Sequence, residues 1–237
     1  MSVTFINEPR IDSKIPEKSI LLRKNSKDLI IKICDKNRSL LGNDVFVEYF
    51  YDGLISVVVK ITDVVARKNN FVLKIRGGDN SAKEASVFEY WKSIGARVPN
   101  VYVVGNEVGL SYFIMEYIEG KNLKESTKGG VYNDAEVAKI LGMLQADLHY
   151  GQISSVTKIP KELKDSISIH AETTSRKFYE ERELTKLEEM DIFPKEWFVN
   201  IDKSFKNIIE KERNEDFNII LGHMDFSSYN IFAGPPQ

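Results

Sequence analysis

A histidine, an aspartate and an asparagine near the end of the chain have the types and spacing of a phosphoryl-transfer loop. In the stretch His-Met-Asp-Phe-Ser-Ser-Tyr-Asn, His223 precedes Asp225 by two residues and Asn230 follows it by five. A carboxylate in this position can orient an attacking hydroxyl and accept its proton, and an amide oxygen can bind a hard cation beside the phosphates. Apolar residues at 219–221 and 231–232 predict short buried strands on both sides. The alternative interpretation is an ordinary strand–loop–strand with polar turn residues.

A lysine and two glutamates form a second group that could take part in such chemistry. Lys74 lies in the apolar run Val-Leu-Lys-Ile at 72–75, and a cation on a covered strand needs a partner. Glu84 is in the first turn of a helix predicted at 81–94, and Glu89 is the competing partner. In phosphoryl transfer a strand lysine contacts phosphates while a helical glutamate holds it. The other interpretation of Lys74 is a solvent-facing strand residue.

The elements that must position these groups follow from hydrophobic periodicity. Five β-rich runs predict strands at 45–51, 55–61, 70–75, 101–104 and 112–118. Apolar residues at helical spacing predict helices at 28–41, 81–94 and 134–150. Asp52 and Gly53 predict a hairpin turn between the first two strands, although one glycine is a poor match to a glycine-rich phosphate loop. Turn formers and charges at 1–27 predict a loosely packed leader.

Strands followed by helices predict an α+β fold with two lobes. The first lobe, residues 1–118, should hold the leader, a helix and a small antiparallel sheet of five strands with one more helix. The second lobe, residues 119–237, should be mostly helical and carry the loop with Asp225. A polar connector at 121–130 would follow the boundary.

Composition narrows the class of protein. The chain has 237 residues, 42% hydrophobic and 29% charged, with a net charge of −2, which predicts a soluble globular protein without nucleic acid as a main partner. Its single cysteine, Cys34, excludes an internal disulfide and favours a reducing compartment. No apolar run approaches the ~20 residues needed to span a bilayer. We therefore expect a cytoplasmic protein with no membrane partner.

Together these pieces resemble the aminoglycoside phosphotransferase and choline kinase superfamily, which has the protein-kinase-like fold. The resemblance covers most of the chain from Val45 onward. The stretches that carry it are Lys83-Glu84-Ala85 before a tryptophan-containing helix, Met115-Glu116-Tyr117-Ile118-Glu119-Gly120, Ala146-Asp147-Leu148-His149, and the loop from His223 to Asn230.

The resemblance implies a nucleotide site on the first lobe. Lys74 would contact the α- and β-phosphates, and Glu84 would hold its ammonium group. Ser56 and the amides near Gly53 would lie over the phosphates. At the connection between the lobes, the backbone of Glu116 and Ile118 would hydrogen-bond adenine, and Met115 would line the base pocket.

In the second lobe the resemblance implies that Asp225 is the catalytic carboxylate and Asn230 a ligand of Mg²⁺. The expected activity is transfer of the γ-phosphate of ATP or GTP to a hydroxyl of a small molecule. Aminoglycosides, choline-like amines, amino alcohols and sugars all remain possible acceptors.

One departure from the family concerns the residues after Asn230. The family carries a metal-binding aspartate there, whereas residues 231–237 contain no carboxylate. We therefore expect this chain to be weakly active or inactive, and a partner or second copy to cover apolar surface of the incomplete second lobe. The alternative function is a kinase-shaped module that binds a nucleotide or a partner without catalysis. A structural protein that binds no nucleotide is the third interpretation.

Overall fold

The computed structural model describes residues 1–51, 53–66, 70–78, 80–154, 159–161, 163, 189, 199–200, 203 and 230–233. The chain divides into two compact units, one formed by Met1–Gly151 with His223–Gln237 and the other by Gln152–Gly222. The elements below belong to the first unit, apart from the last residues of its longest helix. The lobe boundary expected between residues 118 and 119 lies inside this unit and stays a prediction.

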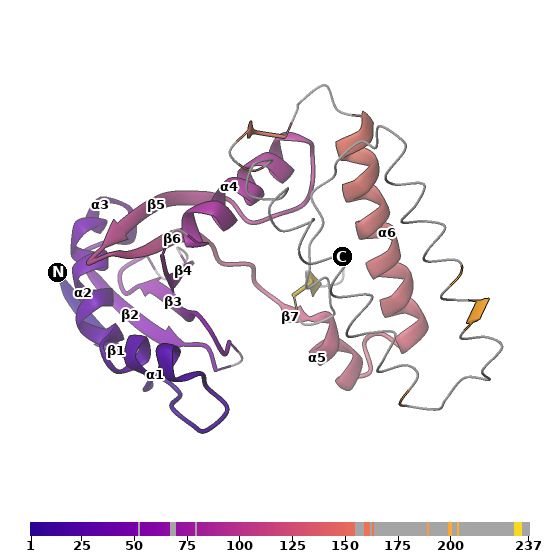
Figure 1. The fold of residues 1–237 in the computed structure, drawn as a ribbon. Helices are drawn as coiled ribbons and strands as arrows, with labels where there is room; N and C mark the ends of the chain where they lie inside the picture. The colour runs from indigo at the N-terminus through magenta and orange to yellow at the C-terminus, as the bar shows by residue number, and fades with distance from the viewer. Residues whose placement is uncertain are drawn as a thin grey trace. The chain divides into compact units, whose positions relative to one another are not determined.

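A mixed six-stranded sheet forms the centre of the first unit (Figure 1). Its strands are β1 (Ser2–Phe5), β2 (Asp44–Tyr49), β3 (Val57–Asp63), β4 (Asn70–Gly77), β5 (Val101–Glu107) and β6 (Leu110–Glu116). They lie in the order β1-β2-β3-β4-β6-β5. Strands β2 to β6 pair antiparallel, as expected for the five predicted strands. The predicted α+β class is confirmed for the described residues.

The first strand corrects two predictions. Residues 1–27 are not a loosely packed leader, because Ser2–Phe5 forms β1 and pairs parallel with β2, and a helix follows at Glu17–Lys24. The sheet is therefore mixed, not purely antiparallel. The alternation of exposed and half-buried residues in β1 lasts only four positions. A strand this short depends on pairing with residues some 40 positions away in the sequence, which local periodicity does not reveal.

Helices and a second small sheet complete the described part of the chain. The helices are α1 (Glu17–Lys24), α2 (Ser26–Lys36), α3 (Arg38–Leu41), α4 (Asn80–Ser93), α5 (Leu123–Lys128) and α6 (Asp134–Ser154). Strands β7 (Lys121–Asn122) and β8 (Phe232–Ala233) pair antiparallel. The connector expected at 121–130 thus contains a strand and a helix. Its helix begins where the Asn122 side chain accepts a hydrogen bond from the Glu125 N–H at 2.8 Å, a cap that the sequence reading missed.

The helix predicted at 28–41 is present as two helices, α2 and α3. Asn37 separates them, and its side-chain amide donates to the carbonyl oxygen of Ile33 at 2.7 Å. Gly42 ends the second helix with a φ of 98°, a conformation that favours glycine. The predicted stop at Gly42 is therefore confirmed.

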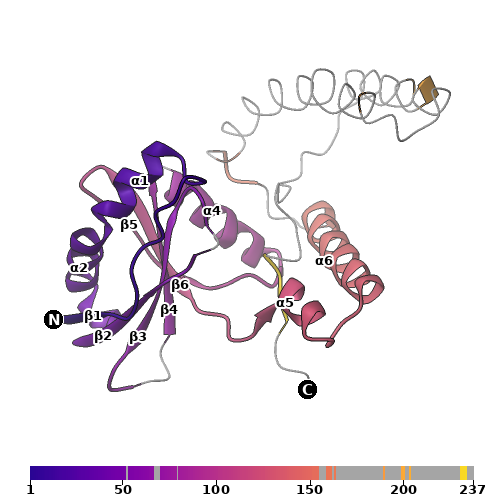
Figure 2. The ribbon, with the colours of Figure 1, turned by 90° about the horizontal axis from the view of Figure 1, so that it is seen from below.

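The two faces of the sheet have different neighbours. Leu29, Ile30, Ile33 and Cys34 of α2 form the core with alternate residues of the strands, including Val59, Ile61, Leu73, Ile75 and Ile114. On the opposite face Phe88 of α4 meets Phe113 of β6 edge-to-face, with ring centroids 6.1 Å apart. Figures 1 and 2 show α2 and α4 on opposite sides of the sheet.

The cysteine belongs to this core. Cys34 is fully buried, and burial raises the pKa of its thiol to about 12, because the apolar surroundings disfavour the thiolate. Its thiol is therefore neutral near pH 7 and serves packing.

No helix among the described residues is long and apolar enough to cross a membrane.

Substituting the buried isoleucine of α2 should destabilise the protein far more than substituting its exposed neighbour. Ile30 is fully buried and Ile31 is 41% exposed. We expect Ile30→Ala to lower the free energy of unfolding by about 2–5 kcal/mol, because it leaves a cavity in the core. Ile31→Ala should change it by less than about 0.5 kcal/mol. Urea unfolding followed by circular dichroism measures both, and equal effects would contradict the packing of α2 on the sheet.

Candidate functional site

The ion pair predicted between a strand lysine and a helical glutamate is present. The Lys74 Nζ of β4 lies 2.6 Å from the Glu84 Oε1 of α4. The side chains are 22% and 28% exposed, so the pair is shielded but open to solvent on one side. Glu89, the competing partner, lies elsewhere, in a surface pocket beside β5.

The position of Lys74 on the sheet explains why it meets α4. Its neighbours Leu73 and Ile75 are fully buried in the core that contains α2. Because successive side chains of a strand point to opposite faces, Lys74 points to the face covered by α4. On that face it pairs across the strands with Val58 and Phe113. The interpretation of Lys74 as a solvent-facing residue without a partner is wrong.

The start of α4 is tied to the same sheet. The N–H of Ser81 donates to the Ser111 hydroxyl of β6 at 3.1 Å, and this hydroxyl donates to the carbonyl oxygen of Arg76 at 3.4 Å. Ala85, next to Glu84, is fully buried, so the helix approaches the sheet closely. The register of α4 on β4 and β6 therefore brings Glu84 to Lys74.

The residues expected to bind adenine lie where β6 ends. Met115 is half-buried and shares the sheet face of Lys74, because the register pairs Val72 with Met115 and Lys74 with Phe113. The N–H of Glu116 donates to the carbonyl oxygen of Asn100 at 2.8 Å. The Glu116 carboxylate accepts hydrogen bonds from the Asn100 N–H at 3.1 Å and from its side-chain amide at 2.6 Å. Asn100 thus holds the end of β6 through three hydrogen bonds.

The chain leaves the sheet after this point. The Tyr117 N–H still donates to the carbonyl oxygen of Asn70 at 3.3 Å. Within the described part of the chain, the backbone of Ile118 makes no hydrogen bond. The N–H and C=O of Ile118 are therefore open to a planar ligand with its own donors and acceptors. The N–H of Glu116 is not open to such a ligand, because it already donates to the carbonyl oxygen of Asn100.

The loop between β2 and β3 carries Gly53 and Ser56. Ser56 is buried, with 8% exposure, so its hydroxyl is shielded from a ligand. The backbone amides of the loop are therefore the candidate donors to phosphate. The carbonyl oxygens of Gly53 and Ser56 both accept hydrogen bonds from the guanidinium of Arg23 in α1. The sequence reading missed Arg23, because an arginine in a short polar helix gives no sign of such contacts.

Space around Gly53 distinguishes it from the glycine of β5. A Cβ added at Gly105 would lie 2.5 Å from the ring of Tyr112, whereas one added at Gly53 would meet only the carbonyl oxygen of Ser56 at 3.6 Å. Glycine is thus required for packing at position 105. At position 53 the fold itself has room for a methyl group.

Of the catalytic-type loop, the described residues include Asn230. His223, Asp225, the predicted strand at 219–221 and the turn residue Asp52 lie outside them. Asn230 is exposed in a turn just before β8, and β8 pairs with β7 so that Lys121 faces Ala233. The loop therefore ends beside the segment that follows the candidate adenine contacts (Figure 1).

The described residues do not fit a magnesium ion by themselves. Among them no three His, Cys, Asp or Glu side chains come together as a metal site. Asn230 could supply one oxygen, whereas Mg²⁺ takes about six oxygen ligands, usually including a carboxylate and phosphates. The predicted role of Asn230 in binding Mg²⁺ stays a prediction.

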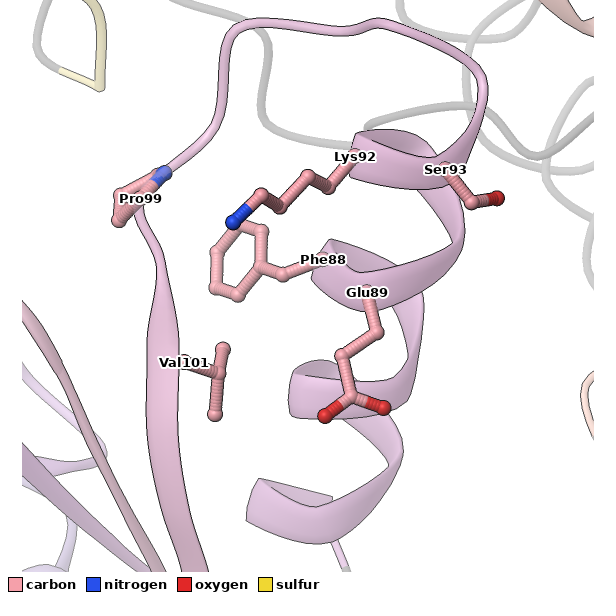
Figure 3. A pocket seen from close by; sticks show the side chains of 6 residues that line it. All are labelled: Phe88, Glu89, Lys92, Ser93, Pro99 and Val101. Carbon is pink, nitrogen blue, oxygen red and sulfur yellow. The ribbon is translucent and has the colours of Figure 1, made fainter.

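A surface pocket lies between α4 and β5 (Figure 3). Its lining residues are Phe88, Glu89, Lys92, Ser93, Pro99 and Val101. Figure 3 shows the Lys92 side chain reaching over Phe88 toward Pro99, and its ammonium donates to the side-chain oxygen of Asn100. Asn100 also binds Glu116, so this pocket is connected to the end of β6 through one hydrogen-bonded side chain.

Comparisons with known proteins give structural likenesses at low sequence identity. No family model and no curated protein sequence matches the chain. One similar structure is a thermostable mutant of the aminoglycoside phosphotransferase APH(4)-Ia with AMP-PNP and hygromycin B, with a TM-score of 0.37, 16% identity and 52% of this chain covered. Another is choline kinase from Cryptosporidium parvum Iowa II, with a TM-score of 0.42, 18% identity and 81% of this chain covered.

Both structures are of the kinds of protein that the sequence motifs resemble. The matches cover 38% of the phosphotransferase chain and 52% of the choline kinase chain. The chain therefore spans about half or less of the length of these proteins. The roles proposed for individual residues therefore rest on the sequence and geometry of this chain and not on these two structures.

A double-mutant cycle should detect the ion pair and distinguish it from the competing glutamate. Lys74→Met and Glu84→Gln should couple by about 0.5–1 kcal/mol in the free energy of unfolding, a modest value because both side chains are partly exposed. Lys74→Met and Glu89→Gln should show coupling near zero. Urea unfolding of the single and double variants measures the coupling. Stronger coupling to Glu89 than to Glu84 would contradict the assigned pair.

Proposed function

We propose that the chain is a weakly active or inactive phosphotransferase, of the kind that moves the γ-phosphate of ATP or GTP to a hydroxyl of a small molecule. The observation that carries the proposal is the 2.6 Å ion pair between Lys74 Nζ and Glu84 Oε1, whose side chains are 22% and 28% exposed. An ammonium group has three donors. Glu84 occupies one and limits the freedom of the lysine stem, so two donors remain for phosphate oxygens.

The adenine contacts follow from the hydrogen bonds at the end of β6. The N–H of Glu116 is engaged by Asn100, so in this proposal adenine meets the carbonyl oxygen of Glu116 and the N–H of Ile118. Met115 supplies the apolar wall of the base pocket. Lys74 lies on the same sheet face, where it would reach the phosphates of the same nucleotide.

The transfer step uses the loop with Asp225. The carboxylate of Asp225 orients the acceptor hydroxyl and accepts its proton while the acceptor oxygen bonds to the γ-phosphorus. The bond from that phosphorus to the bridging oxygen breaks, and the nucleoside diphosphate leaves. Lys74 screens negative charge on the phosphate oxygens during this step. Asn230 remains the candidate ligand for the Mg²⁺ that accompanies the nucleotide.

Calorimetric titration with ATP, with and without Mg²⁺, tests the proposal. Lys74→Met should weaken ATP binding by about tenfold, equal to about 1.4 kcal/mol. Asp225→Ala should leave the dissociation constant within about twofold and abolish any transfer that the unsubstituted chain shows, because it removes the proton acceptor and not a nucleotide contact.

The outcomes separate the candidate functions. Unchanged ATP binding in Lys74→Met, or transfer that persists in Asp225→Ala, would refute the assigned roles. Binding that needs no metal, with no phosphate release, would favour a nucleotide-binding module without catalysis. A chain that binds no adenine nucleotide would be a structural protein.

Alanine at Gly53 should separate a functional glycine from a structural one. Since the added Cβ meets only one carbonyl oxygen at 3.6 Å, Gly53→Ala should leave the melting temperature nearly unchanged. If phosphates approach this loop, the methyl group should weaken ATP binding several-fold and leave adenosine binding unchanged. Gly105→Ala is the control and should lower stability by about 1–3 kcal/mol through its clash with Tyr112. Unchanged ATP binding in Gly53→Ala would argue against phosphates near Gly53.

A further inference from the structure

Helix α1 holds the β2–β3 loop through three backbone carbonyl oxygens. The Arg23 Nη2 donates to the carbonyl oxygen of Gly53 and to that of Ser56, the latter at 3.1 Å. The Ser19 hydroxyl donates to the carbonyl oxygen of Ile55 at 3.0 Å. Arg23 is 2% exposed and Ser19 is 5% exposed. All the acceptors lie 30 or more positions from their donors in the sequence, so these bonds are purely tertiary.

Arg23 is a buried cation that is stabilised mainly by carbonyl oxygens. Its guanidinium also donates to the carbonyl oxygen of Arg10 at 3.4 Å, while its buried Nε has no hydrogen-bond partner among the described residues. Burial and the nearby Arg10 lower the pKa of Arg23, although an arginine keeps its charge in proteins. Among the described residues the carboxylate near Arg23 is that of Asp12, which pairs with Arg10, whereas Asp52, next to Gly53, lies outside the described residues. A buried charge is costly unless it is hydrogen-bonded, and within the described residues the carbonyl oxygens of Arg10, Gly53 and Ser56 supply those bonds to Arg23.

The orientation of the carbonyl groups determines that of the amides. In a planar trans peptide the N–H points opposite to the C=O. The carbonyl oxygens of Gly53 and Ile55 face α1, so the N–H groups of Leu54 and Ser56 point away from it. Neither N–H has a hydrogen-bond partner within the described part of the chain.

Lys74 lies near the end of this loop, because it pairs across the strands with Val58, two residues after Ser56. Leu22 of α1 packs against the core that contains α2, so α1 lies on the α2 side of the sheet. Lys74 points to the opposite face, where it meets Glu84. The two amides thus point away from α1, and the ammonium group lies on the sheet face opposite α1. Neighbouring N–H groups with a cation nearby are a common anion-binding arrangement.

We infer that Arg23, with Ser19, is a positioning residue that turns the Leu54 and Ser56 amides toward the β- and γ-phosphates of a bound nucleotide. This inference rests on the proposed function. Arg23 acts from behind the loop and touches no ligand. The inference gives α1 a part in phosphate binding, although α1 lies outside the stretches that resemble a known family.

Titration with ATP and with adenosine tests the inference. Arg23→Gln should weaken ATP binding by about tenfold and leave adenosine binding within twofold, because only the phosphates meet the loop. Lys24→Gln is the matched control, since it removes one positive charge from the adjacent, exposed position of α1, and both affinities should stay unchanged. Equal losses for ATP and adenosine, or no loss for ATP, would overturn the inference.

A milder variant covers the case in which Arg23→Gln does not fold. Ser19→Ala removes only the hydrogen bond to Ile55 and should weaken ATP binding about threefold with adenosine binding and the melting temperature retained. If Arg23→Gln unfolds and Ser19→Ala binds ATP normally, the inference is wrong. The unsubstituted chain is titrated first. If it binds no ATP, the proposed function fails, whereas normal ATP binding with insensitive α1 variants refutes the positioning role alone.

Discussion

The ion pair between Lys74 and Glu84 is the interaction on which the candidate site depends. A lysine on the covered face of β4 needs a compensating charge, and Glu84 provides it from the first turns of α4 at 2.6 Å. The pair also requires a definite register between helix and sheet, which the hydrogen bond from the Ser81 N–H to the Ser111 hydroxyl helps to maintain. Packing and charge thus specify the same position of α4. The partial exposure of both side chains keeps the ammonium available to an anionic ligand.

Much of this arrangement was predictable because it rests on local patterns. Runs of β-forming residues identified five strands, and helical periodicity identified α2, α4 and α6. The rule that a cation in an apolar strand needs a partner left Glu84 and Glu89 open for Lys74, and the family resemblance implied Glu84. Strand β1 could not be found in this way, since four residues carry too little periodicity and its pairing with β2 joins distant parts of the chain. The strand predicted at 231–232 is present as β8, although Phe232 is exposed and not buried, whereas its partner β7 was missed for the same reason.

Arg23 illustrates a different limit of sequence reasoning. Its partners are backbone carbonyl oxygens, which every residue has, so no residue type marks them in the sequence. In a polar stretch an arginine is more often exposed. What identifies Arg23 is burial together with three carbonyl acceptors, from Arg10, Gly53 and Ser56, and only the tertiary structure supplies that. Asp225 lies outside the described residues, and its catalytic role stays a prediction from motif spacing.

The division of the sheet into two faces explains how a loop with a single glycine could serve a phosphate. Glycine-rich loops owe their fit to backbone freedom and to the absence of side chains near the ligand. Here the peptide groups after Gly53 and Ile55 are held from the α2 side by Arg23 and Ser19, and their N–H groups then point away from α1. In this loop, hydrogen bonds from the buried side chains would fix the orientation of the peptide groups, which in a glycine-rich loop comes from backbone freedom. Such a loop needs glycine only where the ligand comes closest, and Gly53 is the residue at which the fold leaves room to spare.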